Sequence, residues 1–388
     1  MRDADCHVPL LRLLDGYPVR AEVTPDSGRR LVAAQDVPAG GLLLESRPYA
    51  RTVSWPARKR WCAHCHGLSP GAPLKRQCAN SCGAWFCSPE CKAAGAASHP
   101  AARCEAAKAL RAGCQPQLDA ECVQLADLVL DVVAQHWRQR REPASHSAAA
   151  PGPPHPELRD VLAMYTPPAA LLESRPTLYE WPAKWKAVAA AVTHAVACAE
   201  AGLGIQGHAS LLWGLDETAL AQAASKDLSN SFGLWDRCGS CAEAPHRNGG
   251  HGVFPAAALI NHSCLPSASH VHTRQGGWPL LTVTALHDLH EGDEITIRYV
   301  DPTGGDAERS ATFTDTWGFT CSCLRCCGND AGRTAAAAAW DGAFLCGCGY
   351  ARIGAGSLGG KPRKRSECEC PRPWVIAAAP SQPPESGD

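Results

Sequence analysis

The chain has 388 residues, which allows roughly two or three structural units and a substantial hydrophobic core. Its 37 Lys and Arg residues nearly balance its 38 Asp and Glu residues, so direct binding of nucleic acid or a membrane surface is not expected. Residues 1–6 carry acids and lack a long apolar core, which is not the pattern of a secretion signal. The best membrane-span candidate, residues 187–199, contains Thr193 and His194 and is too short to cross a bilayer.

Cysteine is the most informative residue type, with 22 copies. Two interpretations compete: disulfides in a secreted chain, or metal thiolates in a reducing compartment. Many cysteines lie in Cys-x-Cys and Cys-x2-Cys pairs, and one cluster includes a well-spaced histidine. This spacing suits tetrahedral zinc better than disulfides, and it predicts an intracellular zinc protein.

Residues 19–50 are predicted to form strands. Residues 19–23 alternate, and Ser27-Gly28 turns into the apolar run at 31–34. A second turn at residues 38–41 precedes another apolar run. Alone, this pattern is typical of any β-meander.

Residues 62–104 hold eight candidate metal ligands and only two leucines, so metal would have to supply much of the folding energy. The ligand types are spaced as Cys62-x2-Cys65, Cys78-x3-Cys82, Cys87-x3-Cys91 and His99-x4-Cys104. Ser88-Pro89-Glu90 has the cap, proline and acid of a helix start, and this helix would direct Cys91 at a metal. His64 and His66 are expected to be solvated and not to be ligands.

Helices are expected next, over residues 118–133, 185–201 and 215–224. Gly202 is expected to stop the second of them. Residues 142–156 are rich in Pro, Ala and Ser and predict a disordered loop. Alone, these are simply helices that cover a sheet.

An irregular excursion is expected over residues 236–252, where Cys238-x2-Cys241 is a weak sign of metal. An apolar run then ends abruptly in Asn261-His262-Ser263-Cys264, which alone is a polar turn that closes a buried segment. Strands are predicted over residues 280–285 and 295–299.

A short helix is predicted over residues 307–314, before Cys321-x-Cys323-x2-Cys326. These three thiolates lack a fourth ligand for a closed tetrahedral site, and the local competitor Cys327 is adjacent to Cys326, which makes joint ligation uncomfortable. Beyond them, residues 361–365 are either a nuclear import signal or a solvated basic loop. The tail past residue 377 is expected to be disordered. Two further cysteine pairs are compatible with an additional zinc site or with free thiols: Cys346, Cys348, Cys368 and Cys370.

Three stretches in this order, residues 258–266, 291–299 and 319–326, resemble the SET domain of protein lysine methyltransferases. The ligands at residues 62–104 are similar to a MYND zinc finger, which narrows the resemblance to the SET- and MYND-domain (SMYD-type) family. The resemblance implies a mixed α+β protein, a split SET-domain β-clip fold with inserts. Its implied parts are a SET N-terminal part (17–56), a MYND zinc finger (62–104), a helical insert (110–225), a SET core (226–300), a zinc-binding post-SET segment (301–327) and a cysteine-containing extension (328–388).

The resemblance also implies three zinc sites. Two lie in the finger, one made by Cys62, Cys65, Cys87 and Cys91 and the other by Cys78, Cys82, His99 and Cys104. The third is post-SET and takes Cys264, Cys321, Cys323 and Cys326, if the chain folds back. Family members use the finger as a scaffold or to bind proline-rich peptides.

The activity that the resemblance implies is S-adenosylmethionine-dependent methylation of a lysine in a histone or another protein, in the nucleus or the cytoplasm. Tyr299 matches the tyrosine at the methyl-transfer point, and Trp317 would line the lysine channel beside it. The implied cofactor-binding residues are Arg29, Asn230, Asn261, His262 and Phe319. Alone, Tyr299 is also compatible with an ordinary strand aromatic and Phe319 with a core residue.

Three residues depart from the family's pattern, and one of them, Ser267, replaces the asparagine that usually follows Pro266. Arg30 stands where the family has the second glycine of a Gly-x-Gly-Leu turn, and it would be strained if that position needs a positive φ. Trp317 stands where well-studied members have a second tyrosine, and it brings no hydroxyl. The alternative function is therefore a zinc-dependent interaction protein or transcription-regulatory adaptor that uses the finger and has weak or no catalysis.

Overall fold

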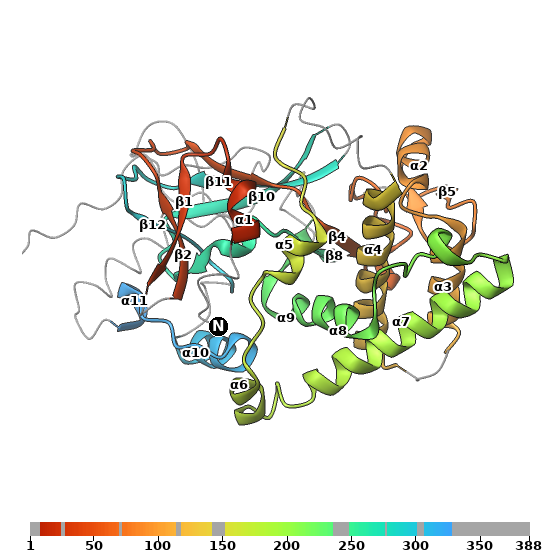
Figure 1. Ribbon diagram of the computed structural model, residues 1–388. Helices are drawn as coiled ribbons and strands as arrows, with labels where there is room; N and C mark the ends of the chain where they lie inside the picture. The colour runs from red at the N-terminus through yellow and green to blue at the C-terminus, as the bar shows by residue number, and fades with distance from the viewer. Residues whose placement is uncertain are drawn as a thin grey trace, which may run out of the picture.

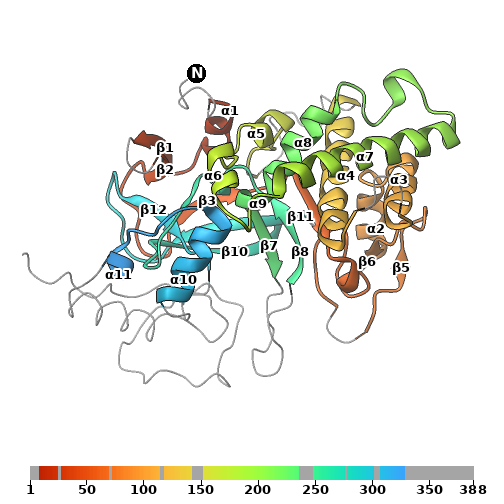
Figure 2. The same ribbon diagram turned by 90° about the horizontal axis from the view of Figure 1, so that it is seen from below.

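The computed structural model describes residues 8–24, 28–69, 72–113, 118–141, 152–235, 248–275, 278–300 and 306–327. In this part of the chain most strands lie at one end of the molecule and the long helices at the other, and β5 (Arg76–Gln77) lies at the helical end beside α2 (Pro89–Ala96) (Figure 1). The view from below shows the same division, with α10 (Asp306–Thr312) beside the strands and away from α3, α4 and α7 (Figure 2). The content is mixed α+β, as the sequence predicts.

Three small sheets make up the strand end. Their orders are β1-β2-β12-β9, β10-β11-β3 and β4-β8-β7. Each sheet pairs strands from before residue 54 with strands from after residue 230, so distant segments close one body. The strands are β1 (Val19–Thr24), β2 (Gly28–Ala33), β3 (Leu42–Ser46), β4 (Ala50–Val53), β7 (Ser231–Trp235), β8 (Asn248–Val253), β9 (Asn261–His262), β10 (Ala268–Gln275), β11 (Trp278–Ala285) and β12 (Glu294–Ile297).

The predicted strands at residues 19–50 are present as β1, β2, β3 and the start of β4. The predicted strand at residues 295–299 and the predicted irregular excursion at residues 236–252 are each wrong in part. β12 ends at Ile297, so Tyr299 follows the strand and does not belong to it. Residues 248–253 form β8, which pairs with β4 through Gly250 and Gly252, so the last part of the predicted irregular excursion is a strand.

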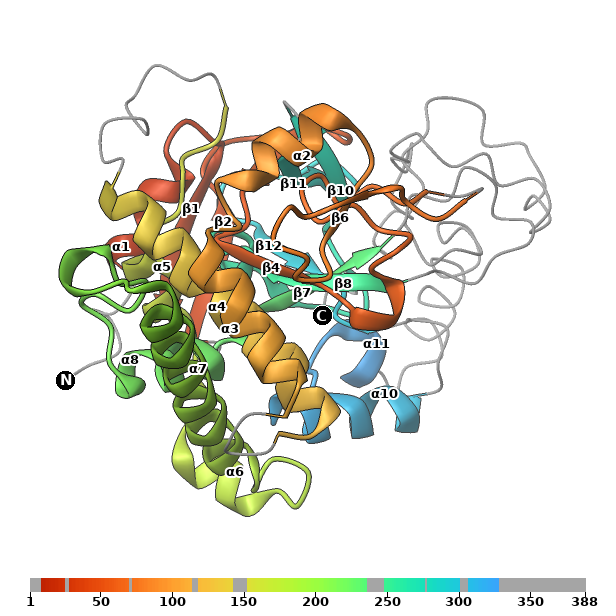
Figure 3. The same ribbon diagram turned by 90° about the vertical axis from the view of Figure 1, so that its right-hand side faces the viewer.

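The cysteine-rich segment carries little regular structure. It contains β5 (Arg76–Gln77), β6 (Trp85–Phe86) and α2 (Pro89–Ala96), and α3 (Ala101–Arg111) follows (Figure 3). Six of its cysteines are packed with Leu74 and Phe86 in a small cluster separate from the main core, and a seventh, Cys87, is exposed. α2 begins as predicted, because the Ser88 side chain accepts a hydrogen bond from the Cys91 backbone at 3.1 Å.

The helical segment is more extensive than predicted. α4 (Ala120–Arg141) continues eight residues beyond Val133, and α8 (Glu217–Ser225) matches its prediction closely. α7 (Trp181–Leu203) passes through Gly202 and ends at Gly204, which adopts a left-handed φ of 68°. Gly202 is therefore not the stop. Shorter helices are α5 (Leu158–Leu162), α6 (Ala169–Ser174) and α9 (Asp227–Asn230).

α7 is, by length and composition alone, apolar enough to cross a membrane, and a core helix of a soluble protein passes the same test. The helix is longer than the stretch that the sequence marked. Val188, Val192 and Val196 are fully buried in the main core together with α4 and α8. The apolar face of α7 is therefore used in packing.

The predicted disordered loop is wrong for its last residues. Residues 142–151 lie outside the described residues, but residues 152–156 are held against the body. The Arg47 Nε donates to the Pro153 carbonyl at 3.0 Å, and the Gln139 side chain donates to the Pro156 carbonyl at 2.8 Å. Pro153 and Pro156 are buried.

Several predictions fall outside the described residues. They concern Cys238 and Cys241, the four C-terminal cysteines at positions 346, 348, 368 and 370, the basic run at residues 361–365 and the tail.

Candidate functional site

The turn at residues 261–264 lies at the edge of the first sheet. The apolar run that precedes this turn is buried. It forms a short 3-10 turn, η5 (Ala257–Leu259), and Ile260 is 1% exposed. β9 then pairs in parallel with β12, which places Asn261 opposite Thr296 and His262 opposite Ile297. This parallel pairing places Tyr299, two residues after the end of β12, beside the turn.

Tyr299 is fixed by two hydrogen bonds. Its backbone N–H donates to Nδ1 of His262 at 3.0 Å, and its hydroxyl donates to the Ile260 carbonyl at 2.7 Å. Burial raises the pKa of the Tyr299 hydroxyl to about 12, so the phenol stays protonated at physiological pH. Tyr299 is therefore a positioned neutral hydroxyl.

His262 links Tyr299 to a cysteine. Because Nδ1 accepts a hydrogen bond from the Tyr299 backbone N–H, the ring proton of neutral His262 is assigned to Nε2, which lies 3.3 Å from the Cys264 sulfur. Burial lowers the pKa of His262 to about 4, which favours this neutral form. The imidazole thus contacts both the tyrosine and a cysteine that is a candidate metal ligand.

Five aromatic rings surround this point. The ring centroids of His262 and Tyr299 are 5.3 Å apart, and those of Tyr299 and Trp317 are also 5.3 Å apart. Phe319 stacks on Phe313 at 5.2 Å, and Phe313 lies 4.3 Å from His262. Sequence reasoning missed Phe313, which is fully buried; its only signal was its place in the predicted helix at residues 307–314.

A π-helical turn, η6 (Phe313–Trp317), directs Trp317 and Phe319 to this cluster. It ends at Gly318 with a φ of 74°, and a Cβ at this glycine would lie 2.4 Å from the Leu171 side chain of α6. The α6 segment therefore lies directly against the aromatic cluster.

Asn261 connects β9 to β2. Its amide N–H groups donate to the Arg29 carbonyl at 2.9 Å and to Oε1 of Glu294 at 3.1 Å. Arg30, the predicted point of strain, lies in β2 opposite Glu22 and donates to its carboxylate at 2.8 Å. Among the described residues other than glycine, the positive φ values belong to His66 and Ser81, so Arg30 is unstrained.

Asn230 is held by different partners from Asn261. It is 4% exposed at the end of α9, and its amide donates to the Tyr165 carbonyl at 2.9 Å and the Lys226 carbonyl at 2.8 Å. α9 packs against η6, which carries Trp317. Asn230 is therefore bonded within the helical segment, on a helix that packs next to the aromatic cluster.

Three groups of candidate metal ligands are assembled among the described residues, and within each group the ligand atoms lie within 4.8 Å of one another. The sulfurs of Cys87 and Cys91 are 3.4 Å apart, and those of Cys264 and Cys326 are also 3.4 Å apart. Tetrahedral zinc with Zn–S bonds near 2.3 Å requires sulfur separations of about 3.8 Å, so the donor sets fit zinc. The groups are Cys62, Cys65, Cys87 and Cys91; Cys78, Cys82, His99 and Cys104; and Cys264, Cys321, Cys323 and Cys326.

The prediction that His64 and His66 are solvated is wrong. They are 2% and 7% exposed. The ring of His64 meets that of Trp278 edge-on at 4.6 Å, and Nε2 of His66 accepts a hydrogen bond from Arg51 at 3.0 Å. Both therefore pack the cysteine-rich segment against the sheets, and neither belongs to a metal group.

The cysteine-rich segment is also tied to α4. Arg111 donates to both carboxylate oxygens of Asp127, at 2.6 and 2.7 Å, and to the Cys82 carbonyl at 2.8 Å. Asp127 is 6% exposed. This bidentate pair connects one metal group to the helical core.

Comparison with known proteins gives one family match and several similar proteins. The SET domain family matches residues 28–300. The histone-lysine N-methyltransferase ASHR2 of Arabidopsis thaliana is 25% identical over 306 residues, which cover 77% of this chain and 69% of that protein. The histone-lysine N-methyltransferase SMYD3 of Homo sapiens is 34% identical over 107 residues, and the N-lysine methyltransferase SMYD2 of Rattus norvegicus is 36% identical over 81 residues. These two alignments cover 28% and 21% of this chain, and 22% and 18% of those proteins.

Proposed function

This chain belongs to the SET-domain family, of the SMYD type, and we propose that it transfers methyl groups from S-adenosylmethionine to the side-chain amine of a lysine in a protein. The observation that carries the proposal is the Tyr299–His262 pair within the matched residues. It places a neutral hydroxyl, a neutral imidazole and an aromatic wall at one point.

Methylation needs a neutral lysine amine. With a reference pKa of about 10.4, neutralising the amine at physiological pH costs roughly 4 kcal/mol. Desolvation by an aromatic channel lowers this cost, and S-adenosylmethionine supplies a methyl group activated by a positively charged sulfur. Tyr299 and Trp317 would form the channel walls nearest to the amine.

Tyr299 would orient the amine and not remove its proton. Its hydroxyl hydrogen is engaged by the Ile260 carbonyl, so the hydroxyl oxygen is an acceptor for an amine N–H. Its raised pKa keeps it neutral, and a phenolate base is not required. Alignment of the amine by such contacts supplies much of the rate in a transfer of this type.

The residues present fit the cofactor. The amide N–H groups of Asn230 and Asn261 donate to carbonyl and carboxylate oxygens of the protein, so their amide oxygens would be the acceptors for a ligand ammonium or amine. Phe319 offers a ring for the adenine, and Arg29 lies at the start of β2 beside Asn261. We assign these four residues and His262 to cofactor binding.

Zinc would occupy the three ligand groups, two in a MYND-type finger at residues 62–104 and one in the post-SET segment. Each group offers four thiolate or imidazole donors within 4.8 Å of one another, which supports this assignment. The finger would serve as a scaffold or as a site for proline-rich peptides, and the protein would act in the nucleus or the cytoplasm.

The finer architecture that we propose is a split SET domain. β1 to β4 would form its N-terminal part and β7 to β12 its core, with the finger and the helices at residues 110–225 as inserts. The pairing of β4 with β8, across nearly 200 residues, supports this division.

The adaptor alternative is not favoured. Arg30 has a partner in Glu22 and no strain, and Trp317 stands against Tyr299 where it can line a channel.

Equilibrium binding of labelled S-adenosylmethionine to the zinc-loaded full chain tests the proposal, followed by methylation of a peptide array read by mass spectrometry. We expect saturable binding that Asn261→Ala weakens. Absence of saturable binding to the zinc-loaded protein would overturn the proposal.

A further inference from the structure

Each of the three candidate metal groups has an arginine beside it that is not itself a ligand. Arg51 of β4 lies beside the first group, Arg103 of α3 beside the second and Arg309 of α10 beside the third. Arg103 is 8% exposed and Arg309 is 2% exposed. A cation this deeply buried is costly unless negative groups surround it. The arginines therefore point to negative charge at the metal groups.

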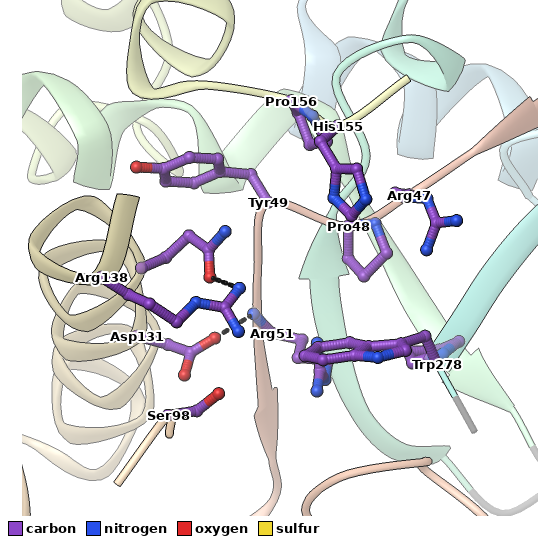
Figure 4. A pocket seen from close by; sticks show the side chains of 12 residues that line it. Arg47, Pro48, Tyr49, Arg51, Ser98, Asp131, Arg138, His155, Pro156 and Trp278 are labelled. Atoms are coloured by element: carbon purple, nitrogen blue, oxygen red, sulfur yellow. Dashed lines mark hydrogen bonds between the residues drawn. The ribbon is translucent and has the colours of Figure 1, made fainter. Parts of the chain in front are cut away.

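Arg51 is fixed at the first group by printed neighbours of a ligand. Its side chain donates to the His64 carbonyl and to Nε2 of His66, each at 3.0 Å, and these two residues lie on either side of Cys65 in the sequence. Its guanidinium carbon lies 4.9 Å from the ring centroid of Trp278 (Figure 4). The negative charge of Cys65 acts on this guanidinium.

Arg103 lies at the second group in a similar way. Its Nη1 is 3.3 Å from Nδ1 of His99, and the negative charge of Cys82 acts on it. The carboxylates of Asp131 and Asp127 act on it as well. At this group, carboxylates of α4 therefore share in balancing the charge of the arginine.

Arg309 contacts the third group directly. It makes side-chain hydrogen bonds to Cys264 and Cys326, and a further one to Asp306. The Asp306 side chain is 77% exposed, so water screens its carboxylate, whereas Cys264 is 1% exposed. A thiolate at Cys264 therefore attracts Arg309 more strongly than Asp306 does.

The place of Arg309 in α10 makes this contact a link to the aromatic cluster. Phe313 follows one helical turn later, so the two side chains lie on the same face of the helix. Phe313 is fully buried and packs with Cys264. The η6 turn that Phe313 begins carries Trp317, which lies against Tyr299. A bond between Arg309 and the metal group therefore fixes the helix from which the aromatic wall extends.

A zinc site with four thiolates needs a counter-charge. It carries a net charge of about −2, because four thiolates outnumber the two positive charges of the ion. In a buried site this charge weakens metal binding unless outer donors offset it. The Arg309 guanidinium supplies one positive charge, and its planar fork suits two acceptors at once. Neutral His262, with Nε2 at 3.3 Å from the Cys264 sulfur, supplies a further donor.

We propose that Arg309 is a positioning residue that balances part of the charge of the third metal group and so anchors α10 and the aromatic wall to it. The inference rests on the zinc assignment made in the proposed function, but it does not require methyl transfer. Loss of Arg309 should weaken zinc at the third group and, through α10, the binding of S-adenosylmethionine. The arginines at the other two groups support this role.

Zinc affinity of the full chain, measured by competition with a chelator, tests the counter-charge. Arg309→Met removes the charge and should weaken zinc at the third group by about 10–100-fold. Arg309→Lys keeps the charge without the fork, so it should recover most of this loss. The matched control is Glu308→Gln, which removes a charge from the exposed neighbour on the same helix and should leave zinc affinity unchanged.

Three further readouts separate this role from a general loosening of the fold. With saturating zinc, Cys326 should react several-fold faster with iodoacetamide in Arg309→Met, as mapped by mass spectrometry, because its thiolate has lost a cationic donor. In the Cys264→Ser background, Arg309→Met should have no further effect on the two remaining zinc ions, because both changes act on one site. S-adenosylmethionine affinity should fall by about fivefold or more in Arg309→Met.

The outcomes distinguish this inference from the proposed function. A wild-type protein that holds no more zinc than Cys264→Ser would overturn the zinc assignment and the inference together. If the wild type holds the third zinc, equal zinc affinity in Arg309→Met would overturn the inference alone. So would Arg309→Lys that binds zinc no better than Arg309→Met, because a counter-charge survives that replacement. Unchanged S-adenosylmethionine affinity in Arg309→Met with weakened zinc would refute the anchoring of the aromatic wall.

Discussion

Replacement of Cys264 by serine tests whether one turn couples a metal site to the cofactor site. Cys264 is 1% exposed, and its sulfur lies 3.4 Å from the Cys326 sulfur and 4.0 Å from the Cys321 sulfur. The same sulfur lies 3.3 Å from Nε2 of His262, whose other nitrogen holds Tyr299. Loss of this thiolate should therefore disturb both zinc and S-adenosylmethionine.

The expected magnitude follows from the ligand count. Structural zinc sites with four ligands bind with apparent free energies of about 10–16 kcal/mol, so one ligand contributes about 3 kcal/mol. Cys264→Ser should then lower zinc affinity at the third group by roughly 100-fold. Through His262, the coupling should weaken S-adenosylmethionine by about tenfold or more.

Zinc per chain after dialysis against a competing chelator and calorimetric S-adenosylmethionine affinity are the two readouts. Cys327→Ser is the matched control, because Cys327 is exposed, adjacent to Cys326 and outside the three metal groups. We expect Cys264→Ser to hold about one zinc fewer than Cys327→Ser. Equal zinc content and equal cofactor affinity in the two variants would refute the ligand assignment and the coupling.

Three further predictions concern the channel, the finger and pH. Trp317→Ala should widen the space beside Tyr299 and shift products toward more highly methylated lysine, as read by mass spectrometry; an unchanged product distribution would exclude Trp317 from the channel. Asp127→Asn leaves Arg111 without its carboxylate and should lower the free energy of unfolding by about 3–5 kcal/mol in denaturant titrations. The control Lys184→Ala, which removes the exposed Lys184–Glu121 pair, should lower it by about 1 kcal/mol or less. Similar losses in the two variants would contradict a stabilising role for the Arg111–Asp127 pair. His251 faces Asp227 at 3.1 Å. Burial opposes the charge of His251, but the Asp227 carboxylate raises its pKa above 6.5. The contribution of the pair to the free energy of unfolding is therefore complete below pH 6.5 and is lost as pH rises through the raised pKa. Unfolding free energy should therefore fall more steeply above pH 6.5 in the wild type than in His251→Gln, and parallel pH profiles would show that the pair does not stabilise the fold.

Local patterns predicted much of this molecule because their physical causes are local. The helix at Ser88 needs only its cap and proline, and the early strands need only alternation and turns. Cysteine spacing marked the ligand-rich segments because metal ligands close together in sequence impose short, regular gaps. The grouping of Cys264 with the downstream cysteines came from the family resemblance, and the structure brings these four together.

The remaining features depend on contacts between distant segments. His64 is buried because Trp278, more than 200 residues away, covers it, and no local pattern encodes that contact. β8 became a strand because β4 supplies its partner, although its own glycine-rich sequence does not favour one. Gly202 stays helical because the cap forms two residues later, at Gly204. Phe313 joins the site because the π-helical turn that it begins places it against Phe319 and His262.

The most direct test of the proposed activity is methyl transfer by the zinc-loaded full chain, with isotope-labelled S-adenosylmethionine and lysine peptides, read by mass spectrometry. Wild-type protein should place the label on a lysine side chain. Tyr299→Phe, which loses the hydroxyl that contacts the Ile260 carbonyl, should be slower by about 100-fold with cofactor affinity retained. Saturable cofactor binding without label on any lysine, or full activity in Tyr299→Phe, would contradict the account.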